Sequence, residues 1–180
     1  MPLSKPVNRK LNHIRNITVN GYERDDGLWD IEGHIVDTKT YDFPSQFRDG
    51  YISAGEHVHE MWLRLSLDDS MEVREVEAVT DFGPFPVCPN VTPNFKRLIG
   101  EKIKPGWTRR VRELLGGIQG CTHLVELLGP IATIAYQTML PPNKNRPEAK
   151  SRLVNSCYAW ASNSPVVRQL YPEEYEPSES

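Results

Sequence analysis

The stretch HVHEMWLRLSL, residues 57–67, decides the fold because its side chains alternate in character. Odd positions from Met61 to Leu67 are apolar, whereas the even positions include the charged side chains of Glu60 and Arg64. A period of two places successive side chains on opposite faces, as in a strand with one buried face. The stretch therefore predicts a half-buried strand.

Two neighbouring segments extend this strand into a sheet. Asp68-Asp69-Ser70 is a turn signal, so residues 72–80 are predicted to form the next antiparallel strand. Upstream, residues 27–37 alternate in the same way. The side chains expected on the core face of that segment are Trp29, Ile31 and Ile35.

The second half of the chain has helical periodicity. Residues 93–102 and 108–115 predict short helices, and a longer helix begins where Thr122 can act as its N-cap. Pro130 is expected to kink this helix, and Pro141-Pro142 ends it. Its expected buried stripe is Leu124, Leu127, Leu128, Ile131, Ile134 and Ala135. The fold class predicted is α+β, an antiparallel sheet packed against a long kinked helix plus short helices.

Composition narrows the class of protein. The chain has 180 residues, a net charge of −3 and three cysteines, which do not form a disulfide framework. No membrane span, signal peptide or basic surface for nucleic acid is indicated, and we expect a cytoplasmic protein. We expect one domain over 1–180, with an N-terminal arm over 1–16 and a disordered acidic tail over 172–180. Residues 1–20 are polar and basic and end in the strand-like Ile17-Thr18-Val19, so an edge strand is the alternative to an arm.

Three polar residues fall on the core face where two predicted strands end. Alternate residues share a face, so Asp37 follows Ile35 inward, and both His57 and His59 precede Met61 on that face. An antiparallel pairing would gather the three beneath the loop 38–56. Buried polar groups need partners, so such a cluster resembles a site. The alternative is a histidine hydrogen-bonded to backbone at a strand end.

The same residues suggest a metal site. His57 and His59 have the H-x-H spacing that lets two imidazoles reach one ion, and Asp37, Cys88 and Cys121 could complete the site. Zinc or iron is favoured by the softness of these ligands. The alternative for Cys88 is a small buried apolar residue.

Gly120 to Glu126 places a thiol, an imidazole and a carboxylate at a helix start. His123 and Glu126 are three residues apart, share a helix face, and could act as an acid–base pair. Alternatively, Glu126 complements the helix dipole and His123 packs behind it. Cys121 is a better candidate ligand than nucleophile, because no base and orienting group can be assigned to it. Cys157, Tyr158 and Trp160 are interpreted as packing residues and not as part of a site.

Three long motifs resemble one known family. Residues 25–34 (DDGLWDIEGH), 59–65 (HEMWLRL) and 120–128 (GCTHLVELL) together resemble the bacterial family catalogued as domain of unknown function 2889. The likeness covers residues 12–170. The family name implies no activity.

A more distant resemblance is to the iron–sulfur scaffold (NifU-like) fold, in which three antiparallel strands precede helices. Its ligand positions would correspond to His57 or His59, Cys88 and Cys121. Histidine stands where that fold has cysteine, and Gly120-Cys121 replaces its His-Cys pair. The resemblance therefore favours the fold over cluster assembly.

These patterns predict a small-molecule enzyme. Aromatic side chains in the 38–56 loop would suit an aromatic substrate; they are Tyr41, Phe43, Phe47 and Tyr51. No nucleotide or flavin fingerprint is present, which leaves proton transfer and bond cleavage. We expect a lyase that releases a small aldehyde such as formaldehyde by a retro-aldol step, with His59 or His123 as base. The alternatives are a metal or iron–sulfur carrier and a structural accessory subunit. A homo-oligomer is left open.

Overall fold

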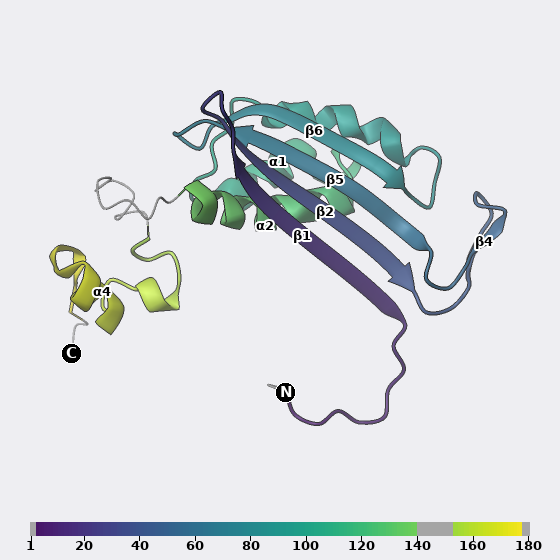
Figure 1. Cartoon of the computed structure of the whole chain (residues 1–180), viewed down its shortest axis with the longest axis horizontal. Coiled ribbons are helices and arrows are strands. Elements are labelled where there is room, and N and C mark those ends of the chain that lie inside the picture. Colours follow the sequence, from purple (N-terminus) through teal and green to yellow (C-terminus); the bar gives the residue numbers. More distant parts are fainter. Residues whose placement is uncertain (1–2, 140–152, 178–180) are drawn as a thin grey trace. The chain divides into compact units, whose positions relative to one another are not determined.

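The structure, a computed structural model, describes residues 3–139 and 153–177. Its contacts divide the chain into two compact units, residues 1–139 and 140–180, each treated separately below (Figure 1). The single domain expected over 1–180 stays a prediction.

Unit 1 is built on a four-stranded antiparallel sheet in the order β1-β2-β5-β6. The strands are β1 (His13–Glu23), β2 (Trp29–Lys39), β5 (His57–Leu67) and β6 (Val73–Phe82), and the connection from β2 to β5 carries the small hairpin β3 (Phe43–Ser45) and β4 (Gly50–Ile52). The strand predicted from residues 57–67 is confirmed to the residue. β1 is an edge strand, the alternative considered for residues 1–20, and it begins at His13, inside the expected arm over 1–16.

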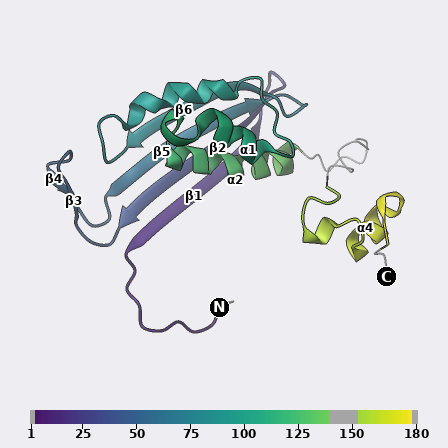
Figure 2. The ribbon, with the colours of Figure 1, turned by 180° about the vertical axis from the view of Figure 1, so that it is seen from behind.

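The helical segments cover one face of this sheet (Figure 2). They are the 3-10 helix η1 (Cys88–Leu98), α1 (Trp107–Leu115), the 3-10 turn η2 (Gly117–Gln119) and α2 (Thr122–Met139). The predicted α+β class is confirmed. The helix predicted over 93–102 is wrong in type and bounds, because Pro89 and Pro93 lack the N–H groups that an α-helix uses.

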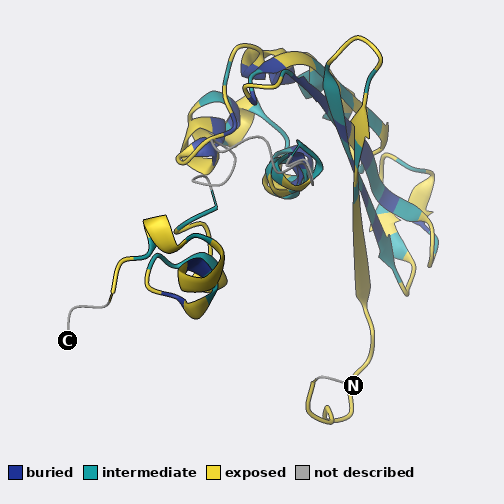
Figure 3. Cartoon of the chain, turned by 60° about the vertical axis from the view of Figure 1, so that its left-hand side comes forward, coloured by how far each residue is buried: buried dark blue, intermediate teal, exposed yellow. Residues whose placement is uncertain are grey.

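The core lies between the sheet and α2, and the buried residues of both layers are dark blue in Figure 3. From β2 and β5 it takes Ile31, Ile35, Met61, Leu63 and Leu65, and from α2 Leu124, Leu127, Leu128 and Ile131. Ile134, expected in the buried stripe of α2, packs against this core only partly buried. Pro130 stands inside α2, where it supplies no N–H for the carbonyl of Glu126.

A β-bulge interrupts the pairing of β2 with β5 at the site end of the sheet. Asp37 lies opposite His59, but the next pair joins Thr38 to His57, so Val58 is an extra residue. The bulge reverses the alternation, and the His57 side chain turns to Glu60, with Nδ1 2.6 Å from Oε2. The prediction that His57 shares the face of His59 is therefore wrong.

Unit 2 is formed by the 3-10 turn η3 (Tyr158–Trp160), the helix α4 (Pro165–Leu170) and the 3-10 turn η4 (Pro172–Glu174). Ser164 caps α4 by accepting a hydrogen bond from the N–H of Val167. Cys157 and Tyr158 are exposed, in contrast to the packing role expected for them. The tail expected to be disordered begins with η4. Pro141-Pro142 lies outside the described residues.

Candidate acid–base site

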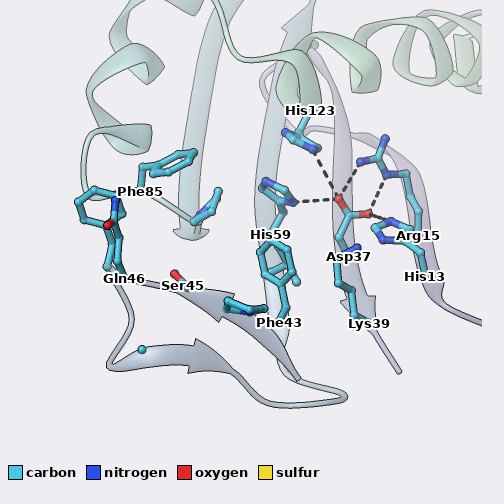
Figure 4. A pocket seen from close by; sticks show the side chains of 15 residues that line it. His13, Arg15, Asp37, Lys39, Phe43, Ser45, Gln46, His59, Phe85 and His123 are labelled. Atoms are coloured by element: carbon cyan, nitrogen blue, oxygen red, sulfur yellow. Dashed lines mark hydrogen bonds and ion pairs between the residues drawn. The ribbon is translucent and has the colours of Figure 1, made fainter. Parts of the chain in front are cut away.

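Asp37 is the centre of the site, and its carboxylate is fully buried although charged neighbours surround it (Figure 4). Arg15 of β1 donates to both oxygens, from Nε to Oδ1 and from Nη2 to Oδ2, each at 2.7 Å. His59 of β5 places Nδ1 3.0 Å from Oδ2, and His13 places Nε2 3.3 Å from Oδ1. Each oxygen of the Asp37 carboxylate therefore has two hydrogen-bonding partners, Arg15 and one histidine. A buried charge requires such partners.

Two imidazoles stack beside this carboxylate. The ring centroids of His59 and His123 are 3.7 Å apart, and Nε2 of His123 lies 3.6 Å from Asp37 Oδ2. His123 reaches the site from the first turn of α2, and its Nδ1 is 3.8 Å from the sulfur of Cys121. Because Asp37 is acceptor-only, the hydrogen bond to His59 requires a proton on Nδ1 and leaves a lone pair on Nε2.

Burial and charge set the protonation states. Burial alone would raise the pKa of Asp37, but the hydrogen bonds and charge of Arg15 outweigh it and lower the pKa to about 2. Burial, followed by the charge of His123, lowers the pKa of His59 to about 4 against the opposing effect of Asp37. Burial and the charge of Arg15 also lower the pKa of His123. At neutral pH the site holds an ionised carboxylate and two neutral imidazoles.

Arg15 also connects the carboxylate to Glu126, with which its Nη1 forms an ion pair. Glu126 is exposed, and its charge also acts on His123, where it opposes the lowering of the pKa. Arg15 is not among the predicted site residues, because its segment is interpreted from the sequence as an arm or an edge strand. The spacing could have identified it, because Arg15, Ile17 and Val19 are two residues apart and share one face of a strand. Val19 packs against the core, so this is the inner face.

The carboxylate and the imidazoles line a cavity of about 810 Å³. Phe43 and Phe47 from the predicted aromatic loop line it, together with Phe85, which the sequence analysis did not select. The rings of Phe47 and Phe85 meet edge to face at 5.6 Å. Tyr41 and Tyr51, also expected to bind substrate, are exposed and do not line this cavity.

The predicted metal ligands are only partly brought together. Asp37, His59 and His123 each offer a ligand atom within 4.8 Å of the others, so they could hold a metal ion. Within the described residues, that group includes neither Cys88 nor Cys121. The Cys88 side chain lies against Gly83, and Cys121 contacts Met61 and His123.

Comparisons with known proteins place the chain in a family but give no activity. No curated protein and no solved structure matches it. No helix among the described residues is both long and apolar enough to cross a membrane. The family model described as "Protein of unknown function (DUF2889)" matches residues 13–137, which contain the whole sheet and the site. Since this match covers more than half of the sequence, the chain belongs to the DUF2889 family.

Proposed function

We propose that the protein is a lyase that cleaves a carbon–carbon bond of a small aromatic compound by acid–base chemistry. The observation that carries this proposal is the pair of neutral imidazoles held by buried Asp37 on the wall of a cavity whose other walls carry phenylalanines. Aromatic walls bind an aromatic ring by stacking and exclude water from the reacting groups.

His59 is the base in this proposal. Its Nδ1–H is fixed by Asp37, so its free Nε2 lone pair can accept the proton of a substrate hydroxyl. The O–H electron pair becomes the C=O bond of a small aldehyde such as formaldehyde. The pair of the broken C–C bond passes to the carbon conjugated with the aromatic ring, and that carbon then takes a proton from the imidazolium.

The neighbouring groups support the transient charge on His59. The ionised carboxylate of Asp37 faces the imidazolium that forms, as an orienting carboxylate does in other acid–base sites. His123 offers a second proton-carrying ring in stacking contact. Arg15, held by Glu126, keeps Asp37 ionised, so Glu126 is a positioning residue.

A second candidate function is metal binding, which the grouping of Asp37, His59 and His123 favours. Zinc or iron suits two imidazoles and a carboxylate, and either ion would stabilise an alkoxide as a Lewis acid. A metal or iron–sulfur carrier without catalysis is the corresponding alternative to the lyase. The free thiols of the chain support a cytoplasmic location in either case.

Three histidine variants test the lyase. Aldehyde release is measured from compounds whose benzylic carbon carries a hydroxymethyl group. The parent, His59→Gln and His123→Gln are compared, with His57→Gln as the control from the opposite sheet face. We expect His59→Gln to lose roughly 10²–10⁴-fold in kcat and His57→Gln to match the parent. Folded His59→Gln and His123→Gln variants with parental turnover would sink the proposal.

Metal analysis of the purified protein separates the two candidates. One zinc or iron per chain, absent from both His59→Gln and His123→Gln, supports the metal site. Full turnover after chelation and dialysis, with no metal detected, supports acid–base chemistry by the imidazoles alone.

A further inference from the structure

The charges around the cavity are unbalanced toward positive. Besides its histidines, the lining includes two cationic side chains, Arg15 and Lys39, and a single carboxylate, Asp37. His13 and Arg15 already contact that carboxylate, and the remaining nitrogen of Arg15, Nη1, forms an ion pair with Glu126.

Lys39 differs from the other two. Its ammonium lies over the rings of Tyr41 and Phe43, 5.4 and 5.3 Å from their centroids. Among the residues that the structure describes, none forms an ion pair with it. Aromatic faces attract a cation but do not neutralise it, so this ammonium retains the capacity to bind an anion.

The position of Lys39 suits a ligand that also reaches the imidazoles. Lys39 is two residues beyond Asp37 at the end of β2, and Figure 4 shows the two side chains entering the cavity one below the other, beside Phe43 and His59. A flat ring among the phenylalanines could therefore contact His59 while a charged substituent meets Lys39.

We propose that the cavity binds an aromatic carboxylate and that Lys39 recognises its anionic group. It rests on the proposed function, which places the reacting end of the substrate at His59, and it adds that the substrate carries a carboxylate. The only carboxylate in the cavity lining is Asp37, which is already paired with Arg15. The carboxylate of a ligand would therefore be attracted by Lys39 and, at longer range, by Arg15. A lysine contacts the carboxylate as a point charge, so either of its oxygens would serve.

Binding of two matched probes tests this proposal. Dissociation constants of 4-hydroxybenzoate and the neutral 4-hydroxybenzamide are measured by calorimetry or ligand-observed NMR on the full chain. We expect the parent to prefer the carboxylate by about tenfold or more, with a preference that shrinks as salt rises. Lys39→Met should abolish the preference by weakening only the carboxylate, and Lys39→Arg should retain most of it.

Lys96→Met is the matched control, because Lys96 is an exposed lysine of η1 that does not line the cavity. It should keep the parental preference. Equal affinity for both probes in the parent, or an unchanged preference in Lys39→Met, would overturn the proposal. The proposal would also be overturned if neither probe binds at a concentration of about 10 mM.

The outcomes separate this inference from the lyase. Carboxylate preference without turnover of any hydroxymethyl aromatic supports the anion site and contradicts the lyase. Turnover of hydroxymethyl aromatic carboxylates with a KM that is unchanged in Lys39→Met supports the lyase and contradicts the anion site.

Discussion

At the scale of single residues, Asp37 combines complete burial with a negative charge, and the surrounding side chains account for both. Arg15 contributes two hydrogen bonds from β1, and His59 contributes one from β5. A buried carboxylate that loses such partners is costly, whereas the same loss on the surface costs little. Asp37 is therefore expected to stabilise the fold as well as to take part in the proposed chemistry.

Asp37→Asn tests this dual role. An amide offers one acceptor where the carboxylate offers two, so Arg15 keeps an unsatisfied donor in a partly buried place. We expect the free energy of unfolding to fall by about 3 kcal/mol in urea titrations. Asp26→Asn, which breaks a more exposed pair with Arg24, should change it by less than about 1 kcal/mol. Equal losses in the two variants would contradict the role of burial.

The histidines predict a loss of stability in mild acid. The pKa of His59 is 6.5 when unperturbed and about 4 in the fold, so the unfolded chain binds more protons between these values. Stability therefore rises with pH through this interval and is lost as pH falls from 6.5 toward 4. In urea titrations the parent should lose roughly 2 kcal/mol over that window from this group, and His59→Gln should show a flatter dependence. Parallel curves for parent and variant would refute the assignment.

At the scale of elements, the approach of α2 to β2 positions His123. Gly33 of β2 faces α2 so closely that a Cβ there would lie 3.0 Å from Ile131 Cδ1 and 3.4 Å from Leu127 Cδ2. The absence of a side chain at Gly33 thus sets the spacing between the layers, and with it the reach of His123 to Asp37.

Gly33→Val tests this spacing. The added methyl groups should push α2 outward, cost about 1–3 kcal/mol of stability and lower kcat by at least roughly tenfold, because His123 moves with the helix. Gly129→Ala is the control on α2 itself, where a Cβ meets nothing within 4 Å. It should raise the unfolding midpoint slightly, since alanine favours a helix by about 1 kcal/mol over glycine. A stable, fully active Gly33→Val variant would contradict this account.

The elements also show what the sequence could and could not predict. Period-two alternation correctly placed Asp37 and His59 on the core face of two paired strands. The bulge at Val58 was not predictable, because one extra residue leaves the local composition unchanged while reversing the face of His57. Arg15 was missed because β1 was not predicted to reach it, and only the pairing of β1 with β2 places Arg15 opposite Asp37.

At the scale of the whole molecule, unit 1 contains everything that the proposed chemistry uses. The buried core runs from Ile31 to Ala135, and the family match ends at residue 137. A chain shortened to residues 1–145 should therefore fold, with binding of 4-hydroxybenzoate and turnover within about twofold of the full chain. Circular dichroism, calorimetry and the aldehyde assay check this. Loss of turnover in a folded shortened chain would assign unit 2 a part in the activity.

The ion pair between Arg15 and Glu126 joins residues 111 positions apart in the chain. A ribosome adds about 5–20 residues per second, so roughly 6–22 s separate the synthesis of these two partners. Until α2 has emerged, His59 lacks the ring of His123 that stacks on it, and Arg15 lacks its ion-pair partner Glu126. The order of translation thus delays the completed site to the last part of the synthesis of unit 1, and no nascent chain that ends before α2 carries it.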